Sequence, residues 1–211
     1  MEQKTEVNVT DTLFNSKIVA ILRGDYHGQW LSLAEALKAG GVTIMEITLN
    51  SPGALDGIGA LRTTYGDQML IGAGTVLSVE ETQRACDVGA QFIVAPDTDE
   101  AVIGACHQQG VPVIPGAYTA TEIKRAYLLG AVMVKLFPAT TPEYVNAVHA
   151  PLGHIPLMPT GGVNAENAAE YMQAGAAALG VGSLLTKPSL SLDEITARAR
   201  KLVAAVGTQH G

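Results

Sequence analysis

The chain has 211 residues, of which 47% are hydrophobic and only 16% are charged, so it is long enough for one large domain with a substantial core. A formal net charge of −7 offers no basic surface to nucleic acid or anionic lipid, and no apolar run reaches the roughly 20 residues of a membrane span. The polar N-terminus differs from a signal peptide, and Cys86 and Cys106 lack ligand-like neighbours. We therefore expect a reduced, cytoplasmic protein without nucleic-acid or membrane partners.

A glycine precedes an apolar run every 20 to 26 residues, which is the length of one helix, one strand and two short loops. Each glycine suits the C-terminal end of a helix, and the set is Gly40, Gly66, Gly89, Gly110, Gly130, Gly153 and Gly175. The predicted helices in chain order are 9–15, 30–39, 78–88, 98–108, 121–129, 142–150, 165–174 and 192–205. The predicted strands are 17–22, 42–49, 69–72, 91–95, 111–115, 131–136, 155–159 and 177–181.

Short apolar strands that alternate with helices predict parallel pairing through right-handed crossovers. Eight such units favour a single (β/α)8 TIM barrel over residues 1–211, with the helix 9–15 as a short N-terminal cap. The alternative is an open doubly wound sheet, which would require a G-x-G-x-x-G turn after the first strand. The sequence there is Leu22-Arg-Gly-Asp-Tyr, so the barrel is favoured.

One lysine, Lys135, interrupts the apolar strand 131–136, which stops at Phe137 and Pro138. Burying an ammonium group in such a strand is unfavourable by several kcal/mol, so the group must be paired, hydrated in a cavity or neutral. A neutral lysine amine is a nucleophile. The alternative is a lysine whose stem lies along the strand and whose head reaches water, but the apolar flanks argue against it.

One carboxylate, Glu46, lies within the apolar strand 42–49. Strand alternation puts Glu46 on the same face as Ile44 and Thr48, so it points into the barrel if Thr48 does. A carboxyl group there would have a raised pKa and could transfer protons near neutral pH. A structural glutamate is the alternative. Because a barrel interior would bring Glu46 and Lys135 together, we favour a nucleophilic amine with a carboxyl acid/base.

Two glycine-rich segments, 159–164 and 179–183, each follow a strand and precede a helix. Free backbone N–H groups at such places attract anions, and barrels commonly hold a phosphate after strands seven and eight. Each segment alone could be only a tight turn. Together they predict a phosphate site at Gly161, Gly162, Gly182 and Ser183.

The carboxyl ends of barrel strands carry the functional groups. Arg23 ends the first strand and Thr75 follows the third, so both could bind a substrate carboxylate, although Arg23 could instead pair with Asp25. The further strand-end residues predicted to form the pocket are Thr48, Asn50, Pro96, Pro115, Phe137 and Thr160. The histidines, including His210, lack metal-ligand spacing and no carboxylates cluster, so we expect no metal and no other cofactor.

Six motifs resemble the class I aldolases of the 2-keto-3-deoxy-6-phosphogluconate and 4-hydroxy-2-oxoglutarate aldolase family. They are IMEITL at 44–49, IGAGTV at 71–76, VIPG at 113–116, VKLFP at 134–138, PTGG at 159–162 and GVGS at 180–183. The resemblance implies Lys135 as the Schiff-base lysine and Glu46 as general acid/base. It also implies Thr75 at the pyruvyl carboxylate, Phe137 and Pro96 as pocket walls, Gly161, Gly162 and Ser183 as the phosphate cradle, and a homotrimer.

The sequence departs from the family at the residue after the Glu-x-Thr-Leu motif, where members commonly carry arginine and this chain has Asn50. Our hypothesis is that Arg23 makes the carboxylate contact instead. The pair of motifs at 21–24 and 49–52 resembles the 2-keto-3-deoxy-6-phosphogalactonate branch, whereas Thr160 resembles the phosphogluconate branch. The preferred C4 epimer is therefore open.

The expected activity is cleavage of a 2-keto-3-deoxy-6-phospho sugar acid to pyruvate and D-glyceraldehyde 3-phosphate, as in Entner–Doudoroff carbohydrate metabolism. One alternative is an aldolase for unphosphorylated substrates of the 4-hydroxy-2-oxoglutarate type. Another is a barrel without catalysis that binds a phosphorylated metabolite through its glycine segments, but it would leave the buried Lys135 and Glu46 without a role.

Overall fold

Parallel strands alternate with helices along residues 8–207, the part of the chain that the computed structural model describes. The strands are β1 Ile18–Leu22, β2 Ile44–Thr48, β3 Leu70–Gly74, β4 Ile93–Val94, β5 Val113–Ile114, β6 Gly116–Ala117, β7 Val134–Leu136, β8 Leu157–Pro159 and β9 Leu179–Val181. The helices are α1 Val9–Ser16, α2 Trp30–Ala39, α3 Ala54–Tyr65, α4 Val79–Asp87, α5 Glu100–Gln109, α6 Ala120–Leu128, α7 Pro142–Leu152, α8 Ala168–Gln173, α9 Ser183–Thr186 and α10 Leu192–Gly207, with a 3-10 turn at Gly66–Gln68.

The predicted elements are confirmed in order and type, with shifts at their ends. Each of the eight predicted strands overlaps an observed strand, although β3 ends two residues beyond the predicted end at Gly72, and α2 begins and ends where it was predicted. The helix α3, the strand β6 and the short helix α9 were not predicted. Pro115 explains the break between β5 and β6, because proline has no N–H to donate to the strand ladder.

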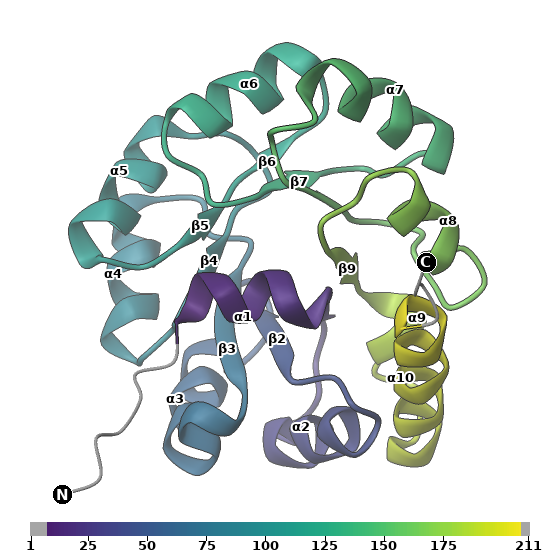
Figure 1. Cartoon of the computed structure of the whole chain (residues 1–211). Coiled ribbons are helices and arrows are strands. Elements are labelled where there is room, and N and C mark those ends of the chain that lie inside the picture. Colours follow the sequence, from purple (N-terminus) through teal and green to yellow (C-terminus); the bar gives the residue numbers. More distant parts are fainter. Residues whose placement is uncertain (1–7, 208–211) are drawn as a thin grey trace, which may run out of the picture.

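The strands form two parallel sheets, one in the order β5-β4-β3-β2-β1-β9 and the other in the order β6-β7-β8. Only Pro115 separates β5 from β6, so the chain itself joins the sheets on one side. On the other side a bridge pairs Thr160 with Gly180, and the amide of Ala177 donates to the carbonyl of Leu157 at 2.8 Å. Helices surround the strands on the outside (Figure 1), so the architecture is an α/β fold of the TIM-barrel type.

Two apolar clusters divide the interior. The inner cluster lies between the strands and holds Leu13, Val19, Ile44, Leu70, Phe92, Val94, Ile114, Met133, Met158 and Ala178. The outer cluster contains the alternate strand residues, such as Met45 and Ile47, together with the helix faces. Side chains two residues apart share a strand face, so Glu46 faces inward with Ile44 and Lys135 faces inward with Met133. The place of Ile44 in the inner cluster agrees with the inward orientation that strand alternation predicted for Glu46.

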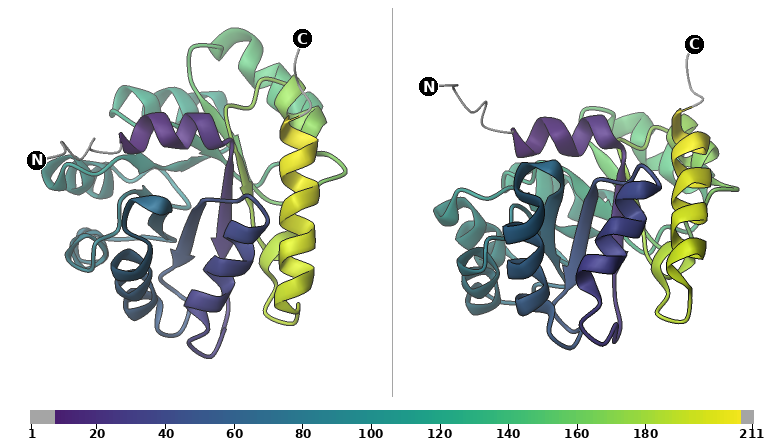
Figure 2. Two further views of the ribbon diagram at one scale, coloured as in Figure 1. Left: turned by 60° about the horizontal axis from the view of Figure 1, so that its bottom comes forward. Right: turned by 90° about the horizontal axis from the view of Figure 1, so that it is seen from below.

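The helix α1 contributes Leu13 to the inner cluster, with 1% of that residue exposed. Figure 2 shows α1 crossing one end of the strands. The Asn8 side chain accepts hydrogen bonds from the amides of Thr10 and Asp11 and so begins this helix. An apolar residue on a capped helix thus closes the inner cluster at that end.

The repeated glycines lie at helix C-termini, as predicted. Gly40, Gly66, Gly110 and Gly153 are C-cap residues, and Gly89, Gly130 and Gly175 come one residue after the C-cap. Gly110 has a φ of 69°, a left-handed conformation that glycine adopts at little cost. Its amide bonds to the carbonyls of Cys106 and His107, so it ends α5 and turns the chain toward β5.

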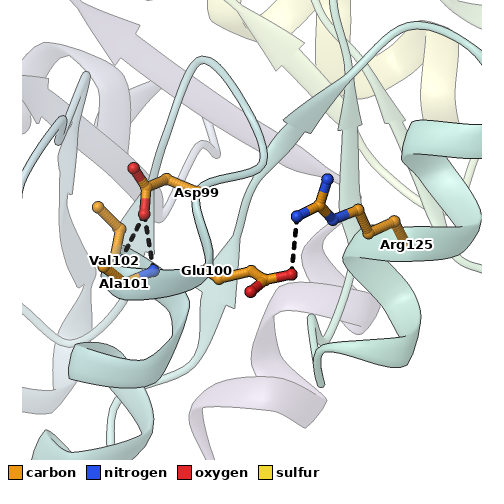
Figure 3. A network of polar contacts seen from close by, with 5 residues as sticks. All are labelled: Asp99, Glu100, Ala101, Val102 and Arg125. Atoms are coloured by element: carbon orange, nitrogen blue, oxygen red, sulfur yellow. Dashed lines mark hydrogen bonds and ion pairs between the residues drawn. The ribbon is translucent and has the colours of Figure 1, made fainter.

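Polar contacts on the outer surface fix the starts and the packing of the helices (Figure 3). Oδ1 of Asp99 accepts from the amides of Ala101 and Val102 at 2.7 and 3.2 Å and begins α5. The adjacent Glu100 pairs with Arg125 of α6 at 2.7 Å. Because both side chains of this ion pair are exposed, it stabilises the fold by about 1 kcal/mol at most. This ion pair therefore adds little to the packing of α5 against α6.

Candidate active site

A cavity of about 200 Å³ opens where β1, β7, β8 and β9 end. Its lining includes eight predicted site residues, namely Arg23, Lys135, Phe137, Thr160, Gly161, Gly162, Gly182 and Ser183. Ile21, Val163 and Leu184 complete the lining and were not predicted. Larger hollows lie elsewhere on the surface, for example about 540 Å³ beside Leu31 and Leu192, but this cavity reaches the buried Lys135.

Lys135 lies in the middle of β7, with 2% of its surface exposed. Register pairs place it beside Gly116 on one neighbouring strand and Met158 on the other. Its Nζ atom lies 5.3 Å from the centre of the Phe137 ring. Burial lowers the pKa of the Lys135 amine, while the nearby Glu46 opposes this shift. The amine is therefore neutral, and nucleophilic, at a lower pH than an ordinary lysine.

Glu46 is fully buried in β2, beside Ile21 of β1 and Gly72 of β3. Within residues 8–207 neither of its carboxyl oxygens has a hydrogen-bond partner. Burial raises the pKa of Glu46, and the charges of Lys135 and Arg23 lower it by less. A buried polar group without a partner is unfavourable by about 1–3 kcal/mol. This unpaired carboxyl is therefore the feature of the fold that most needs a functional explanation.

Arg23 follows β1 and lines the cavity. Its Nη2 atom donates to Oγ1 of Thr75 at 3.2 Å, which joins residues 52 positions apart. Thr75 itself has a left-handed φ of 55°. Asp25 instead accepts from the amide of His27, so within the described chain the alternative ion pair of Arg23 with Asp25 does not form. The guanidinium is left with donors free for an anion.

The two glycine-rich segments lie side by side, because the bridge between Thr160 and Gly180 joins their strands. Gly161 and Gly162 have φ values of 99° and 73°, conformations in which only glycine is unstrained. Ser183 begins α9 directly after Gly182. All four predicted phosphate residues line one wall of the cavity, where backbone amides can face an anion.

Several predicted pocket residues lie behind or beside the cavity instead of lining it. Thr48 is fully buried, and its hydroxyl donates to the carbonyl of Leu22 at 3.3 Å. Asn50 is exposed in the turn after β2. Pro115 is buried at the junction of β5 and β6, and Pro96 packs against the neighbouring Gly116. The structure thus gathers the residues of β1 and of β7 to β9 around the cavity. These four residues are outside its lining, and so are the predicted Glu46 and Thr75.

No helix within residues 8–207 is long and apolar enough to cross a membrane. The same part of the chain has no group of three His, Cys, Asp or Glu side chains that could hold a metal ion. His210 lies outside the described residues. The cavity lining supplies a lysine and an arginine. The buried Glu46 carboxyl lies outside that lining, and its charge acts on the pKa of Lys135.

A buried amine on β7 and a buried carboxyl on β2, within a fold of parallel strands, fit one class of enzyme, a Schiff-base lyase. The family model for KDPG and KHG aldolase matches residues 9–201. A 2-dehydro-3-deoxy-phosphogluconate aldolase of Treponema pallidum is 34% identical over 95% of this chain and 99% of its own length. A 2-dehydro-3-deoxy-6-phosphogalactonate aldolase of Escherichia coli is 38% identical over 89% and 93%.

A solved structure of KDPG aldolase from Legionella pneumophila, with pyruvate captured as a covalent carbinolamine, has a TM-score of 0.81. It is 27% identical and covers 92% of this chain and 97% of its own. The chain belongs to the KDPG and KHG aldolase family, and it is a class I aldolase, a carbon–carbon lyase. The resemblance inferred from the sequence motifs is confirmed.

Proposed function

We propose that the protein cleaves a 2-keto-3-deoxy-6-phospho sugar acid to pyruvate and D-glyceraldehyde 3-phosphate. The observation that carries this proposal is the buried Lys135 amine, which shares the barrel interior with a buried Glu46 carboxyl that has no hydrogen-bond partner. The curated relatives named for the phosphogluconate and phosphogalactonate substrates support the substrate class. Cleavage places the protein in carbohydrate metabolism of the Entner–Doudoroff type.

In the proposed mechanism, Lys135 attacks the C2 ketone and Glu46 transfers protons as the carbinolamine forms and loses water. The protonated Schiff base then withdraws electrons from the C3–C4 bond. Glu46 removes the proton of the C4 hydroxyl, the bond breaks, and the aldehyde leaves. The remaining enamine is reprotonated at C3, and hydrolysis releases pyruvate and the free lysine. The raised pKa of Glu46 and the lowered pKa of Lys135 suit these proton transfers near neutral pH.

The substrate carboxylate is proposed to bind Arg23, which lines the cavity, and Thr75, to which Arg23 donates a hydrogen bond. Arginine can hold a carboxylate with two parallel hydrogen bonds. Phe137 is proposed as a pocket wall, because it lines the cavity next to the lysine. Pro96, Pro115, Thr48 and Asn50 would act from beside or behind this pocket.

A close approach behind Glu46 gives a test of its position. A Cβ atom added to Gly74 would lie 2.6 Å from Oε1 of Glu46, so the carboxyl would have to move. We expect Gly74→Ala to lower kcat by about 100-fold, because small misplacements of catalytic groups have effects of this size. Gly104→Ala is the matched control, since nothing lies within 4 Å of a Cβ there. An unchanged kcat for Gly74→Ala in steady-state pyruvate release would contradict the role of Glu46.

The 6-phosphate is proposed to bind the amides of Gly161, Gly162, Gly182 and Ser183. We expect Ser183→Asp to raise KM for the phosphorylated substrate by about 10-fold or more, because the new carboxylate repels the phosphate. Inorganic phosphate should inhibit the wild type competitively. If the unphosphorylated 2-keto-3-deoxy acid reacts with the same kcat/KM as its 6-phosphate, and phosphate does not compete, the alternative substrate of the 4-hydroxy-2-oxoglutarate type is favoured.

The preference for the gluconate or galactonate epimer is proposed to depend on Thr160, which lines the cavity and is 4% exposed. Its hydroxyl donates to the carbonyl of Met158 at 3.2 Å. Thr160→Val removes that hydroxyl at similar volume, and we expect the ratio of kcat/KM for the two phosphorylated epimers to change. Equal ratios in the wild type and the variant would remove Thr160 from the account of specificity.

We further propose one closed (β/α)8 domain over residues 1–211, with α1 as its cap, that assembles as a cytoplasmic homotrimer. The contacts that join the two sheets support closure, and Leu13 in the inner cluster supports the cap. Exposed apolar side chains support an assembly, since Leu77 is 55% exposed, Val79 50% and Leu128 73%. Sedimentation equilibrium at micromolar concentration should give three times the mass of one chain, and a monomer would contradict the trimer.

A further inference from the structure

The backbone on both sides of Arg23 is held by two side-chain hydroxyls from the end of β2. Oγ1 of Thr48 donates to the carbonyl of Leu22 at 3.3 Å, and the amide of Gly24 donates to Oγ of Ser51 at 3.1 Å. The two hydroxyls lie 2.9 Å apart and bond to each other. Residues directly before and after Arg23 are therefore fixed by one connected hydroxyl pair.

A third hydroxyl extends this arrangement on the opposite side of β1. Thr186 of α9 is 1% exposed, and its Oγ1 donates to the carbonyl of Ile21 at 2.6 Å. The paired register of β1 with β9 ends at Ala20, so this bond holds the strand beyond its ladder. Gly24 has a φ of 135°, which turns the chain sharply after Arg23. The segment that carries the arginine thus ends in a bend held by side chains.

The burial of these hydroxyls argues for a specific role. Thr48 is 0% exposed and Ser51 is 5% exposed, whereas the intervening Asn50 is exposed. Arg23 itself is exposed, and within residues 8–207 its guanidinium donates one hydrogen bond, to Thr75. Because the long Arg23 side chain has one hydrogen bond to another residue, its orientation depends largely on the conformation of its backbone. The hydroxyl pair is therefore placed to decide whether Arg23 points at the cavity.

We propose that Ser51, together with Thr48, is a positioning residue that directs Arg23 at the carboxylate of the substrate. This inference rests on the proposed function of Arg23. Neither hydroxyl lines the cavity, so both act through the backbone of residues 22–24 and do not touch the substrate. Ser51 then supplies the hydrogen bond that fixes the backbone next to Arg23 at the end of β1.

The test compares two ketones that differ in charge, namely pyruvate and its uncharged amide, pyruvamide. Schiff-base formation is measured by borohydride trapping over a range of ketone concentrations. Loss of one hydrogen bond corresponds to about a 5-fold change, so Ser51→Ala is expected to raise the half-saturating pyruvate concentration about 5-fold. The value for pyruvamide should change less than about 2-fold, and so should the trapping rate at saturation. Ser32→Ala, at an exposed serine of α2, is the matched control and should change neither ketone.

Thr48 supplies a second pair of variants in case Ser51→Ala folds poorly. Thr48→Val removes the hydroxyl at nearly constant volume and should raise the half-saturating concentration of pyruvate but not that of pyruvamide. Thr48→Ser keeps the hydroxyl and should leave both concentrations as in the wild type. Two results for Ser51→Ala and Thr48→Val would overturn the inference. Equally weakened binding of both ketones would show a general structural role, and unchanged binding of both would show no role for the hydroxyls.

Arg23→Ala separates this inference from the proposed function. Arg23→Ala should weaken pyruvate binding more than Ser51→Ala does. In a protein that already carries Arg23→Ala, adding Ser51→Ala should not weaken pyruvate binding further. Additive effects in the double variant would overturn the positioning role while leaving Arg23 as the carboxylate ligand. If Arg23→Ala leaves pyruvate and pyruvamide unchanged, the carboxylate contact itself is wrong and the inference fails with it.

Discussion

Replacing Lys135 with alanine is expected to lower kcat by about 10⁴-fold or more. Removing a nucleophile that forms the covalent intermediate typically has an effect of this size. The variant cannot form a Schiff base, so the electron sink for breaking the C3–C4 bond is lost. The measurement is the steady-state release of pyruvate from the 6-phosphorylated 2-keto-3-deoxy acid.

The matched control for this experiment is Lys124→Ala on α6. Lys124 is exposed, so its loss should leave kcat within about 2-fold of the wild type. Circular dichroism should confirm that both variants keep their helices. If folded Lys135→Ala protein retains more than a trace of turnover, another group must form the covalent bond and the assignment of Lys135 is wrong.

Replacing Glu46 with glutamine is expected to lower kcat by about 10²- to 10⁴-fold, the usual contribution of a general acid/base. The amide has nearly the same shape as the carboxyl but cannot transfer the proton. Because Glu46 is proposed to act in both imine formation and cleavage, the rate of borohydride-trappable adduct formation should fall together with turnover. A variant that forms the adduct and turns over at wild-type rates would exclude Glu46 from proton transfer.

The same substitution makes a prediction about stability and pH. Burial raises the pKa of Glu46 in the folded state, so above the pKa of the unfolded chain the folded protein binds more protons at this site. The free energy of unfolding contributed by Glu46 therefore decreases as pH rises from about 4.3 through the raised pKa. Glutamine removes this loss, so Glu46→Gln should gain stability relative to wild type as pH increases.

Urea denaturation at pH 5, 6.5 and 8 measures this difference. Each pH unit within the window changes it by up to about 1.4 kcal/mol. Lys135 changes the stability difference in the same direction. Loss of the Glu46 charge lowers the pKa of folded Lys135 further, so the variant releases this proton at a lower pH than the wild type does. Over that pH range the variant gains stability relative to the wild type as pH rises. A difference in unfolding free energy that stays constant or shrinks with pH would show that Glu46 is not held with a raised pKa.

The fold was predictable where local chemistry repeats along the chain. Glycine at each helix C-terminus and an apolar strand after it gave the order of elements, since both signals depend on nearby residues alone. Strand alternation also indicated the inward orientation of Glu46, and the apolar flanks of Lys135 indicated its burial. Ile21 could have been found by the same rule, because it lies two residues before Arg23 on the face of β1.

The helix α3 shows why other elements were not predicted. Gly57 and Gly59 lie within it, and each glycine lowers helix propensity by about 1 kcal/mol relative to alanine. Tertiary packing explains Gly57, because a Cβ there would lie 2.7 Å from the Trp30 ring. A helix of such weak propensity forms because it packs against α2, which the local pattern of residues does not encode.

The site was predictable by type and less so by geometry. Strand-end positions grouped Arg23 with Thr75, and the structure joins these residues by a hydrogen bond across 52 positions of the sequence. The rule for strand ends does not say which of them open into a cavity, so Pro115 and Asn50 were grouped with the lining residues. The bond from Gly24 to Ser51 likewise depends on how β1 and β2 pair, which follows from the assembled sheet.

The most direct test of the central claim is borohydride reduction in the presence of pyruvate, followed by peptide mass spectrometry across residues 131–138. The account predicts a reduced pyruvyl adduct on Lys135, which would establish the covalent step and its position together. Unmodified Lys135 in folded protein, with a known class I aldolase labelled in parallel, would contradict the Schiff-base mechanism and favour a barrel that only binds its ligand.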